Sequence, residues 1–323
     1  MDIFKQYNSL IERINQCLLG SISPELPKIL GEPIQYFFNQ PSKKIRPLLG
    51  IFCCNAVGGA EDDAIHAATA IELFHDFTLI HDDIMDKDEL RRGKPTIHVR
   101  WDSGIAILVG DALIGLSFQQ LMKSSGIYLN QVAKIFSDAL VKVCEGQALD
   151  KSFETIPQVS LADYLEMIAK KTAWLFKVAC EIGAILGGGT PDQIERLSNF
   201  GYNLGLAFQI QDDLLDFTAD EGKLGKKVGS DFRMDKKTYI TLEYQEILKD
   251  NLQLKNQYPE HERDFHSLAD FQKALKEIGV ISAVEKEVNQ HFEKSLNLLR
   301  ELLPDEKNHP LYMITHFIKD RQY

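Results

Sequence analysis

Apolar residues recur at spacings of three and four through most of the chain, as in segments 71–86 and 164–186. This spacing places them on one face of an α-helix, whereas sustained strand-like alternation is hard to find. Gly and Pro interrupt the pattern between such segments, for example at Pro41, at Gly58-Gly59 and in 187–191. The pattern predicts an all-α protein built from many helices.

The organisation of the chain into domains follows from what the pattern lacks. No change in composition and no low-complexity linker separates the two halves. The polar stretch 249–263 is the best linker candidate, but a surface loop before the last helices explains it equally well. With 44% hydrophobic residues in 323, the chain has enough material for one large core. We therefore expect a single domain over residues 1–323.

The formal net charge of −11 argues against nucleic acid or an anionic membrane as the main partner, because both require a broad basic surface. No apolar run approaches the roughly 18 residues of a membrane span, and the first residues lack the order of a secretory signal. The five cysteines form no CxxC pair, which favours buried reduced thiols. We expect a cytoplasmic protein without a membrane span. Any anionic small substrate would need local cations or metal ions.

Two copies of one aspartate pattern are the most informative feature, DDIMD at 82–86 and DDLLD at 212–216. Residues four apart share a helix face, so Asp82 lies over Asp86 and Asp212 over Asp216. Like charges stacked in this way, within apolar runs, are unfavourable unless a cation lies between them. A solvated acidic face would explain one copy alone. Two copies favour Mg²⁺, which takes carboxylate oxygens and is completed by substrate phosphate oxygens.

Two other metal sites are excluded by spacing. A calcium loop that begins at Asp86 would place Arg91 where an EF-hand requires Gly. The stretch from His261 to His266 resembles a zinc motif, but its five-residue spacing turns the two rings away from each other.

Basic residues cluster near both aspartate motifs. RRGKP follows the first motif at 91–95, and KKIRP stands at 43–47. Their forked and point-charge donors suit phosphate oxygens, although either run alone is more often a solvated surface. Lys170-Lys171-Thr172 interrupts an apolar helix. Lys226-Lys227 and Lys236-Lys237 lie in the Gly- and Asp-rich segment after the second motif, which we expect to be a mobile lid. No nucleotide-binding P-loop sequence occurs.

With these motifs in their order, the sequence resembles the trans-isoprenyl diphosphate synthase, or polyprenyl synthetase, family from about Pro41 to Thr241. The resemblance implies the isoprenoid synthase fold, a helical bundle around a central active-site cavity, in a homodimer. It implies a trans-prenyltransferase in which about three Mg²⁺ ions bridge the aspartates and an allylic diphosphate. The allylic diphosphate ionises to a carbocation, the double bond of isopentenyl diphosphate attacks it, and loss of a proton completes each cycle.

The resemblance also assigns residues to roles. The metal ligands are Asp82, Asp86, Asp150, Asp212 and Asp216, with Asp83 and Asp213 in support. The residues that hold isopentenyl diphosphate are Lys43, Arg46, His75 and Arg92. The residues around the allylic diphosphate are Arg91, Lys171, Thr172, Gln209, Lys226 and Lys236. All of these except Lys236 are also assigned to catalysis, because they neutralise the diphosphate as it leaves.

The chain departs from the family pattern at three positions. Ser42 replaces a usual Gly, Ile240 replaces a common Pro, and Asp235 replaces the Gly before Lys236. A serine fits most turns. The carboxylate of Asp235 can pair with the neighbouring Lys236 ammonium in place of phosphate. Of the three departures, this one therefore bears on the predicted contact between Lys236 and phosphate.

We expect side chains of the helix that leads into Asp82 to limit the length of the growing product. At about 1.5 Å per residue, Thr78 lies roughly 6 Å, Phe77 about 7.5 Å and Phe74 about 12 Å below Asp82. In the resembling family, aromatics at the first two positions tend to stop growth at fifteen carbons, and small residues permit long chains. Small Thr78 with large Phe77 resembles geranylgeranyl diphosphate synthases, which make twenty-carbon products.

Several alternatives remain. If Phe74 shortens the pocket, the product is farnesyl diphosphate, and both phenylalanines could simply pack against a neighbouring helix. A class I terpene cyclase would also bind a diphosphate on Mg²⁺ but would have no use for Lys43, Arg46 and Arg92. A non-catalytic subunit of a heteromeric synthase would show eroded aspartates, and none is eroded here.

Overall fold

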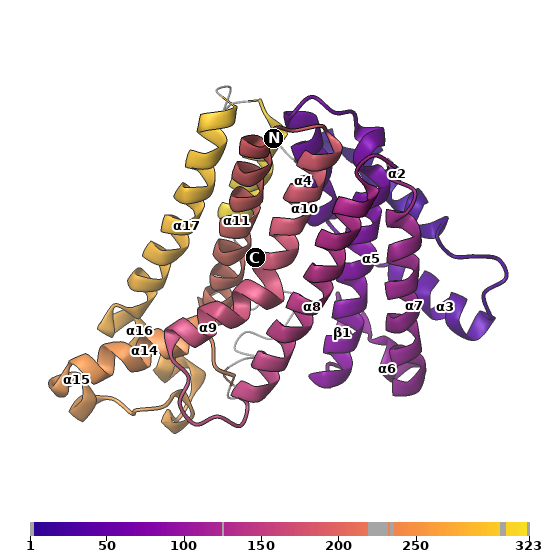
Figure 1. Cartoon of the computed structure of the whole chain (residues 1–323). Coiled ribbons are helices and arrows are strands. Elements are labelled where there is room, and N and C mark those ends of the chain that lie inside the picture. Colours follow the sequence, from indigo (N-terminus) through magenta and orange to yellow (C-terminus); the bar gives the residue numbers. More distant parts are fainter. Residues whose placement is uncertain (1–2, 125, 219–231, 233–235, 304–307, 322–323) are drawn as a thin grey trace. The chain divides into compact units, whose positions relative to one another are not determined.

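The structure, a computed structural model, describes residues 3–124, 126–218, 232, 236–303 and 308–321 (Figure 1). The regular elements among these residues are helices, apart from one short hairpin, which confirms the predicted all-α fold. The chain divides into two compact units, each described here by itself. The first unit comprises Met1–Leu140, Leu175–Gly201 and Leu299–Ile314, and the second comprises Val141–Trp174, Tyr202–Leu298 and Thr315–Tyr323. The single domain remains a prediction.

The elements within the first unit are α1 (Ile3–Gln6), α2 (Asn8–Leu19), α3 (Lys28–Phe38), α4 (Ile45–Ala56), α5 (Glu61–Met85), β1 (Leu90–Arg91), β2 (Lys94–Pro95), α6 (Ile97–Arg100) and α7 (Ser103–Leu121). Those within the second are α9 (Leu161–Ile168), the π-helix η1 (Ala169–Ala173), α14 (Tyr239–Asp250), α15 (Leu252–Gln257), the 3-10 helix η2 (Glu262–Asp264) and α16 (Leu268–Ile278). Five helices have residues in both units: α8 (Leu129–Phe153), α10 (Trp174–Leu186), α11 (Pro191–Thr218), α17 (Val280–Leu302) and α18 (Pro310–Lys319).

Helix α5 lies at the centre of the first unit, where α2, α4 and α7 pack against it (Figure 1). Acidic residues fill its first turn, and the Asp63 carboxylate accepts a hydrogen bond from the Ala60 N–H at 2.8 Å. Both features stabilise a helix N-terminus. Buried alanines, among them Ala67 and Ala70, let the neighbouring helices approach closely. The core therefore fixes the helix that carries the first aspartate motif.

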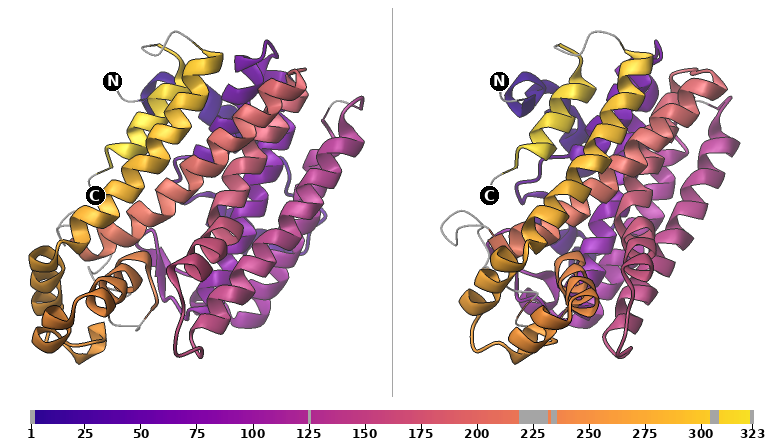
Figure 2. Two further views of the ribbon diagram at one scale, coloured as in Figure 1. Left: turned by 60° about the vertical axis from the view of Figure 1, so that its left-hand side comes forward. Right: turned by 90° about the vertical axis from the view of Figure 1, so that its left-hand side faces the viewer.

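The second unit has an aromatic core around Phe271 of α16. Its ring lies 5.8 Å from Phe217, 5.2 Å from Tyr244 and 5.1 Å from Phe265, measured between centroids. Gln272 donates to the Phe217 carbonyl at 2.7 Å, which ties α16 to the end of α11. Helix α17 runs along α11 within this unit (Figure 2). These contacts hold the helix that carries the second aspartate motif.

Helix α7 is long and apolar enough to cross a membrane by length and composition, which the sequence analysis did not expect of any segment. Half of its most apolar window is buried inside the protein, as in the core helix of a soluble protein. Ile107 and Leu108 of this helix, and Met122 directly after it, are exposed.

The cysteines are all free thiols. Cys53, Cys54 and Cys180 are buried, as predicted. The expectation of burial is wrong for Cys144, which is exposed on α8, and Cys17 is only partly buried.

Candidate active site

The first aspartate motif lies at the C-terminal end of α5. Asp86 caps the helix, and its N–H donates to the Asp82 carbonyl at 2.8 Å, so the helical register continues through the motif. Asp82 and Asp86 are therefore one turn apart on one face, as predicted, and both are partly exposed. Asp83 is only 2% exposed and belongs to the buried side of the helix.

The Asp83 carboxylate binds an arginine and does not lie on the helix face that Asp82 and Asp86 share. Nε and Nη2 of Arg91 donate to Asp83 Oδ1 at 2.7 and 2.6 Å, and Nη2 also lies 3.8 Å from Asp88 Oδ2. Burial raises the pKa of the Asp83 carboxyl, and the hydrogen bond and charge of Arg91 partly offset this effect. The supporting role expected for Asp83 thus has a physical form: it anchors Arg91, which is assigned to the allylic diphosphate.

The basic run after the first motif forms a hairpin that the sequence analysis missed. Strands β1 and β2 are antiparallel, with Arg91 opposite Lys94. The two residues between them, Arg92 and Gly93, have positive φ of 53° and 74°, as in the two-residue turns that suit the twist of a hairpin. Arg92 therefore stands at the tip, with its guanidinium 5.8 Å from the ring of Phe37.

Arg46 and His75 meet at the start of α4. Arg46 Nη1 lies 3.1 Å from His75 Nε2, and the guanidinium stacks 4.5 Å from the ring of Phe176. Burial lowers the pKa of His75, and the neighbouring cations, Arg46 first among them, lower it further. A neutral imidazole whose Nε2 accepts from Arg46 fits this contact.

Helices α4 and α10 touch backbone to backbone next to this pair. A Cβ placed on Gly183 would lie 2.0 Å from the Gly50 carbonyl oxygen, so only glycine fits there. The close approach brings Phe176 of α10 under Arg46 of α4.

Lys44 and Glu72 form a buried ion pair that the sequence analysis also missed. Lys44 Nζ lies 3.0 Å from Glu72 Oε1, and both side chains are almost fully buried. Ser42, which replaces a family glycine, donates to the same Glu72 oxygen at 3.2 Å. In the run KKIRP, the second lysine is thus structural.

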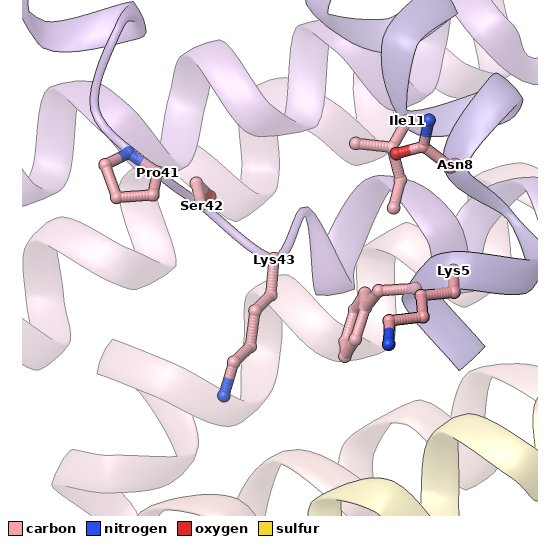
Figure 3. A pocket seen from close by; sticks show the side chains of 7 residues that line it. Lys5, Asn8, Ile11, Pro41, Ser42 and Lys43 are labelled. Carbon is pink, nitrogen blue, oxygen red and sulfur yellow. The ribbon is translucent and has the colours of Figure 1, made fainter. Parts of the chain in front are cut away.

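Lys43, by contrast, lines an open pocket of about 680 Å³ in the first unit. The other lining residues are Phe4, Lys5, Asn8, Ile11, Pro41 and Ser42. Figure 3 shows the Lys43 and Lys5 side chains extending beside the same open space from two separate segments. Two lysines there give the pocket a positive lining.

The second aspartate motif lies near the C-terminal end of α11. Asp212 and Asp216 are partly exposed on one face, and Asp213 is only 4% exposed. Asp213 accepts hydrogen bonds from Tyr164 Oη at 2.5 Å, Gln209 Nε2 at 3.0 Å and the Tyr239 N–H at 3.0 Å. The burial pattern of the first motif is repeated, with different partners for the buried aspartate.

Thr172 and Gln209, both assigned to the allylic diphosphate, lie together in the second unit. Thr172 Oγ1 donates to Gln209 Oε1 at 2.9 Å, and Gln209 in turn donates to Asp213. Lys171 Nζ lies 2.6 Å from Asp150 Oδ2, so a predicted metal ligand and a predicted phosphate cation are in contact.

The π-helix η1 places Lys171 and Thr172. A widened helical turn of this kind is frequent at functional sites. Gly146 of α8 lies directly against it, since a Cβ there would come within 2.3 Å of the Lys171 backbone nitrogen. The small residue is needed for α8 to bring Asp150 to Lys171.

Arg321 was not singled out by the sequence. Its guanidinium stacks 4.0 Å from the ring of Phe208, donates to the Phe208 carbonyl and Gln211, and lies 3.6 Å from Asp212 Oδ1. The C-terminal end of the described chain thus contacts the second motif. No local pattern signals this contact, because the two positions are far apart in the sequence.

The segment expected to be a lid is described only in part. Lys226 and Asp235 lie outside the described residues, and Lys236 is partly buried. Lys237 Nζ donates to the carbonyls of Phe153 and, at 2.7 Å, Ile156. This lysine therefore tethers the start of α14 to the end of α8.

The ligands that the two aspartate motifs offer to a divalent cation are pairs of carboxylates. Within the ranges that the structure describes, no three or more His, Cys, Asp or Glu side chains converge to hold a metal by themselves. Each motif offers two carboxylates on one face. Such a pair fits Mg²⁺, which keeps several waters and is usually completed by substrate phosphate oxygens. The two motifs belong to different units.

Comparison with known sequences defines the class of protein. The sequence model of the polyprenyl synthetase family matches residues 27–278. The chain belongs to this family and is a trans-prenyltransferase, an isoprenyl diphosphate synthase. The family depends on divalent metal ions and uses isopentenyl diphosphate and an allylic diphosphate. The terpene cyclase alternative is thereby set aside.

Similar proteins narrow the class to the short-chain synthases. The chain is 45% identical over 244 residues to the short chain isoprenyl diphosphate synthase of Methanothermobacter thermautotrophicus, covering 75% of this chain and 74% of that protein. The crystal structure of geranylgeranyl pyrophosphate synthetase from Pyrococcus horikoshii Ot3 matches with a TM-score of 0.91 and 34% identity, over 99% and 98% of the two chains. A polyprenyl synthase from Caulobacter crescentus, complexed with calcium and isoprenyl diphosphate, matches with a TM-score of 0.86 and 27% identity over 99% and 97%.

Proposed function

We propose that this short-chain synthase is a geranylgeranyl diphosphate synthase that uses Mg²⁺. The observation that carries the proposal is the doubled aspartate motif, in which each copy presents two carboxylates and buries the third. Asp82, Asp86, Asp150, Asp212 and Asp216 would hold about three Mg²⁺ ions. These ions would neutralise the diphosphate as it departs from the allylic carbon.

The protein groups around the allylic diphosphate are held before it binds. Asp83 orients Arg91, and Asp213 orients Gln209, which in turn accepts from Thr172. Donors fixed in this way stabilise developing negative charge without reorganising during the reaction. Lys171 would move from Asp150 to phosphate when metal occupies that carboxylate. Lys226 and Lys236 complete the proposed set.

Isopentenyl diphosphate would bind in the first unit, at Lys43, Arg46, His75 and Arg92. Lys43 lies in the loop before α4 and lines the pocket shown in Figure 3. Arg46 and His75 are in contact, and Arg92 stands at the hairpin tip. No metal is assigned to this diphosphate, so its charge is met by side chains alone. Neutral His75 can donate its remaining ring proton.

The product length is proposed from the residues below Asp82. Thr78 is small, and its hydroxyl donates to the His75 carbonyl at 2.7 Å. Phe77 stacks on Phe74 with 5.2 Å between centroids, and Phe74 packs edge-on against Phe136 at 5.3 Å. Phe77 braced in this way would form a floor one turn and a half below the metals, which favours twenty carbons. If the pocket for the growing chain is shorter, the product is farnesyl diphosphate, which is the alternative.

The test is incorporation of radiolabelled isopentenyl diphosphate with five-, ten- and fifteen-carbon allylic primers. We expect each primer to be extended to a twenty-carbon diphosphate, EDTA to stop the reaction and Mg²⁺ to restore it. A fifteen-carbon end product would support the farnesyl alternative. No incorporation with any primer would refute an independent catalytic role and favour a non-catalytic subunit.

Lys5 provides a control for Lys43, because it lines the same pocket but is not among the residues assigned to isopentenyl diphosphate. We expect Lys43→Ala to raise the KM for isopentenyl diphosphate about tenfold or more, which corresponds to one lost charge-assisted contact of roughly 1.4 kcal/mol or more. The KM for the allylic primer should change less. Lys5→Ala should leave both values near wild type. A larger change for the primer would mean that the two sites are assigned the wrong way round.

We also propose a cytoplasmic homodimer that folds as a single domain. The exposed apolar residues Ile107 and Leu108 of α7, with Met122 directly after it, support self-association, because exposed apolar surface is unfavourable in water. Light scattering on the purified protein tests this.

A further inference from the structure

Asp76 is a buried carboxyl group that the proposed reaction does not use. It lies on α5 and is 1% exposed. Neither of its oxygens has a hydrogen-bond partner within the part of the chain that the structure describes. Most buried carboxylates are paired or bonded, because an isolated charge in the interior is costly. This group therefore needs an explanation.

The charged groups that face Asp76 come from three segments. Glu72 lies one turn earlier on α5, Lys44 and Arg46 lie at the start of α4, and Arg92 lies at the hairpin tip. His75 is adjacent in sequence, and its pKa is lowered by burial and by the same cations. Burial raises the pKa of Asp76 to about 7; Glu72 raises it too, while Lys44, Arg92 and Arg46 lower it.

These three cations differ in the roles assigned to them. Lys44 is already paired with Glu72, at 3.0 Å. The two remaining cations, Arg46 and Arg92, are the arginines assigned to isopentenyl diphosphate. A bound diphosphate would therefore neutralise the charges that favour ionised Asp76.

We propose that Asp76 couples isopentenyl diphosphate binding to proton uptake: its carboxylate takes a proton from solvent when the diphosphate engages Arg46 and Arg92. Asp76 does not touch the substrate and acts through the arginines as a positioning residue. The inference rests on the proposed assignment of these arginines. By reciprocity, protonation of Asp76 strengthens diphosphate binding by the same factor by which binding favours protonation.

The expected signature is a KM for isopentenyl diphosphate that rises with pH. Below neutral pH, Asp76 is protonated and the KM is low. Above it, each binding event must first take up a proton, so the KM should rise about tenfold between pH 6 and pH 8. The substrate's own ionisation acts in the opposite direction but is common to all variants.

The kinetic test compares wild type with Asp76→Asn from pH 6 to pH 8.5. Asparagine is close in size and stays neutral, so its KM for isopentenyl diphosphate should lack the rise, leaving about a tenfold ratio to wild type at pH 8. Asp63→Asn is the matched control, since it makes the same change at the other end of α5, and it should follow wild type. The KM for the allylic primer is the internal control.

Calorimetry gives a readout that does not depend on turnover. Isopentenyl diphosphate alone is titrated into the protein at pH 8 in two buffers with different heats of ionisation. Wild type should take up close to one proton more per site than Asp76→Asn. If that variant does not fold, Asp76→Ala replaces it, and the wild-type uptake must still decrease from pH 8 to pH 6.

The outcomes separate the two hypotheses. Parallel pH profiles for wild type and Asp76→Asn, or equal proton uptake, would overturn the role of Asp76 while turnover persists. Absence of any turnover of isopentenyl diphosphate by wild type would overturn the proposed function instead.

Discussion

The two aspartate motifs have the same pattern of exposure but different supports. In the first, buried Asp83 holds one charged partner, Arg91, from the hairpin that follows directly in sequence. In the second, buried Asp213 accepts hydrogen bonds from neutral groups of α9, α11 and α14, namely Tyr164, Gln209 and the Tyr239 N–H. The same five-letter pattern therefore orients a phosphate-binding arginine in one place and joins helices in the other.

The position of the nearby cation differs as well. In the first motif, the arginine pairs with the buried middle aspartate. In the second, Arg321 lies 3.6 Å from Asp212, which is itself an assigned metal ligand. A cation bound at the second motif would therefore share the Asp212 carboxylate with an arginine. The two motifs should differ in how they respond to mutation.

The largest effect is expected where the motifs act alike. Asp82→Ala and Asp212→Ala should each lower kcat at least about a hundredfold, roughly 3 kcal/mol of barrier, because each removes a proposed metal ligand. Circular dichroism should show an intact fold. Asp88→Ala, next to the first motif but without an assigned ligand role, is the control and should retain most activity. A loss below about tenfold in either ligand variant would falsify the metal-clamp assignment.

A smaller effect, on stability, should separate the motifs. Asp213→Ala should cost about 3 kcal/mol in urea unfolding, since it leaves buried donors unsatisfied. Adding Tyr164→Phe should recover only part of this cost, because two further donors remain. Asp83→Ala should instead be rescued largely by adding Arg91→Ala, which removes the arginine that Asp83 binds. Equal rescue in the two double variants would show that the supports do not differ.

The smallest effect concerns product length and should be confined to the first motif. Phe77→Ala should lengthen the main product by at least one five-carbon unit, because it removes the proposed floor. Phe208→Ala, four residues before Asp212, should not, because that ring lies under Arg321. Mass spectrometry of the products decides. If both variants lengthened the product, the helix before Asp82 would not be the only element that determines product length.

Much of the fold could be predicted from the sequence, because helix formation depends on the local spacing of apolar residues. The apolar periodicity predicted helix over 71–86 and 164–186, which lie in α5 and in the run of α9, η1 and α10. The four-residue spacing placed Asp82 over Asp86 correctly. The hairpin at 90–95 was missed because strands of two residues carry no alternation. Its turn requires positive φ at Arg92, which the composition of the run does not indicate.

The supporting contacts were less predictable, for a different reason. Tyr164, Tyr239 and Arg321 reach the second motif from distant parts of the sequence, and no periodicity records such distances. Lys44 and Lys43 are adjacent and chemically identical, yet only Lys44 is buried with Glu72. Asp76 reads as one more polar residue in an apolar helix. The roles assigned through the family resemblance remain predictions.

The contact between Gly183 and Gly50 has a consequence for variation in this protein. Any side chain at position 183 would drive α10 away from α4 and carry Phe176 off the Arg46 guanidinium. In a saturation library selected for product formation, position 183 should tolerate one amino acid, although no ligand or substrate role is assigned to it. Damaging substitutions should therefore be as frequent at this contact between α4 and α10 as at the aspartates of the two motifs.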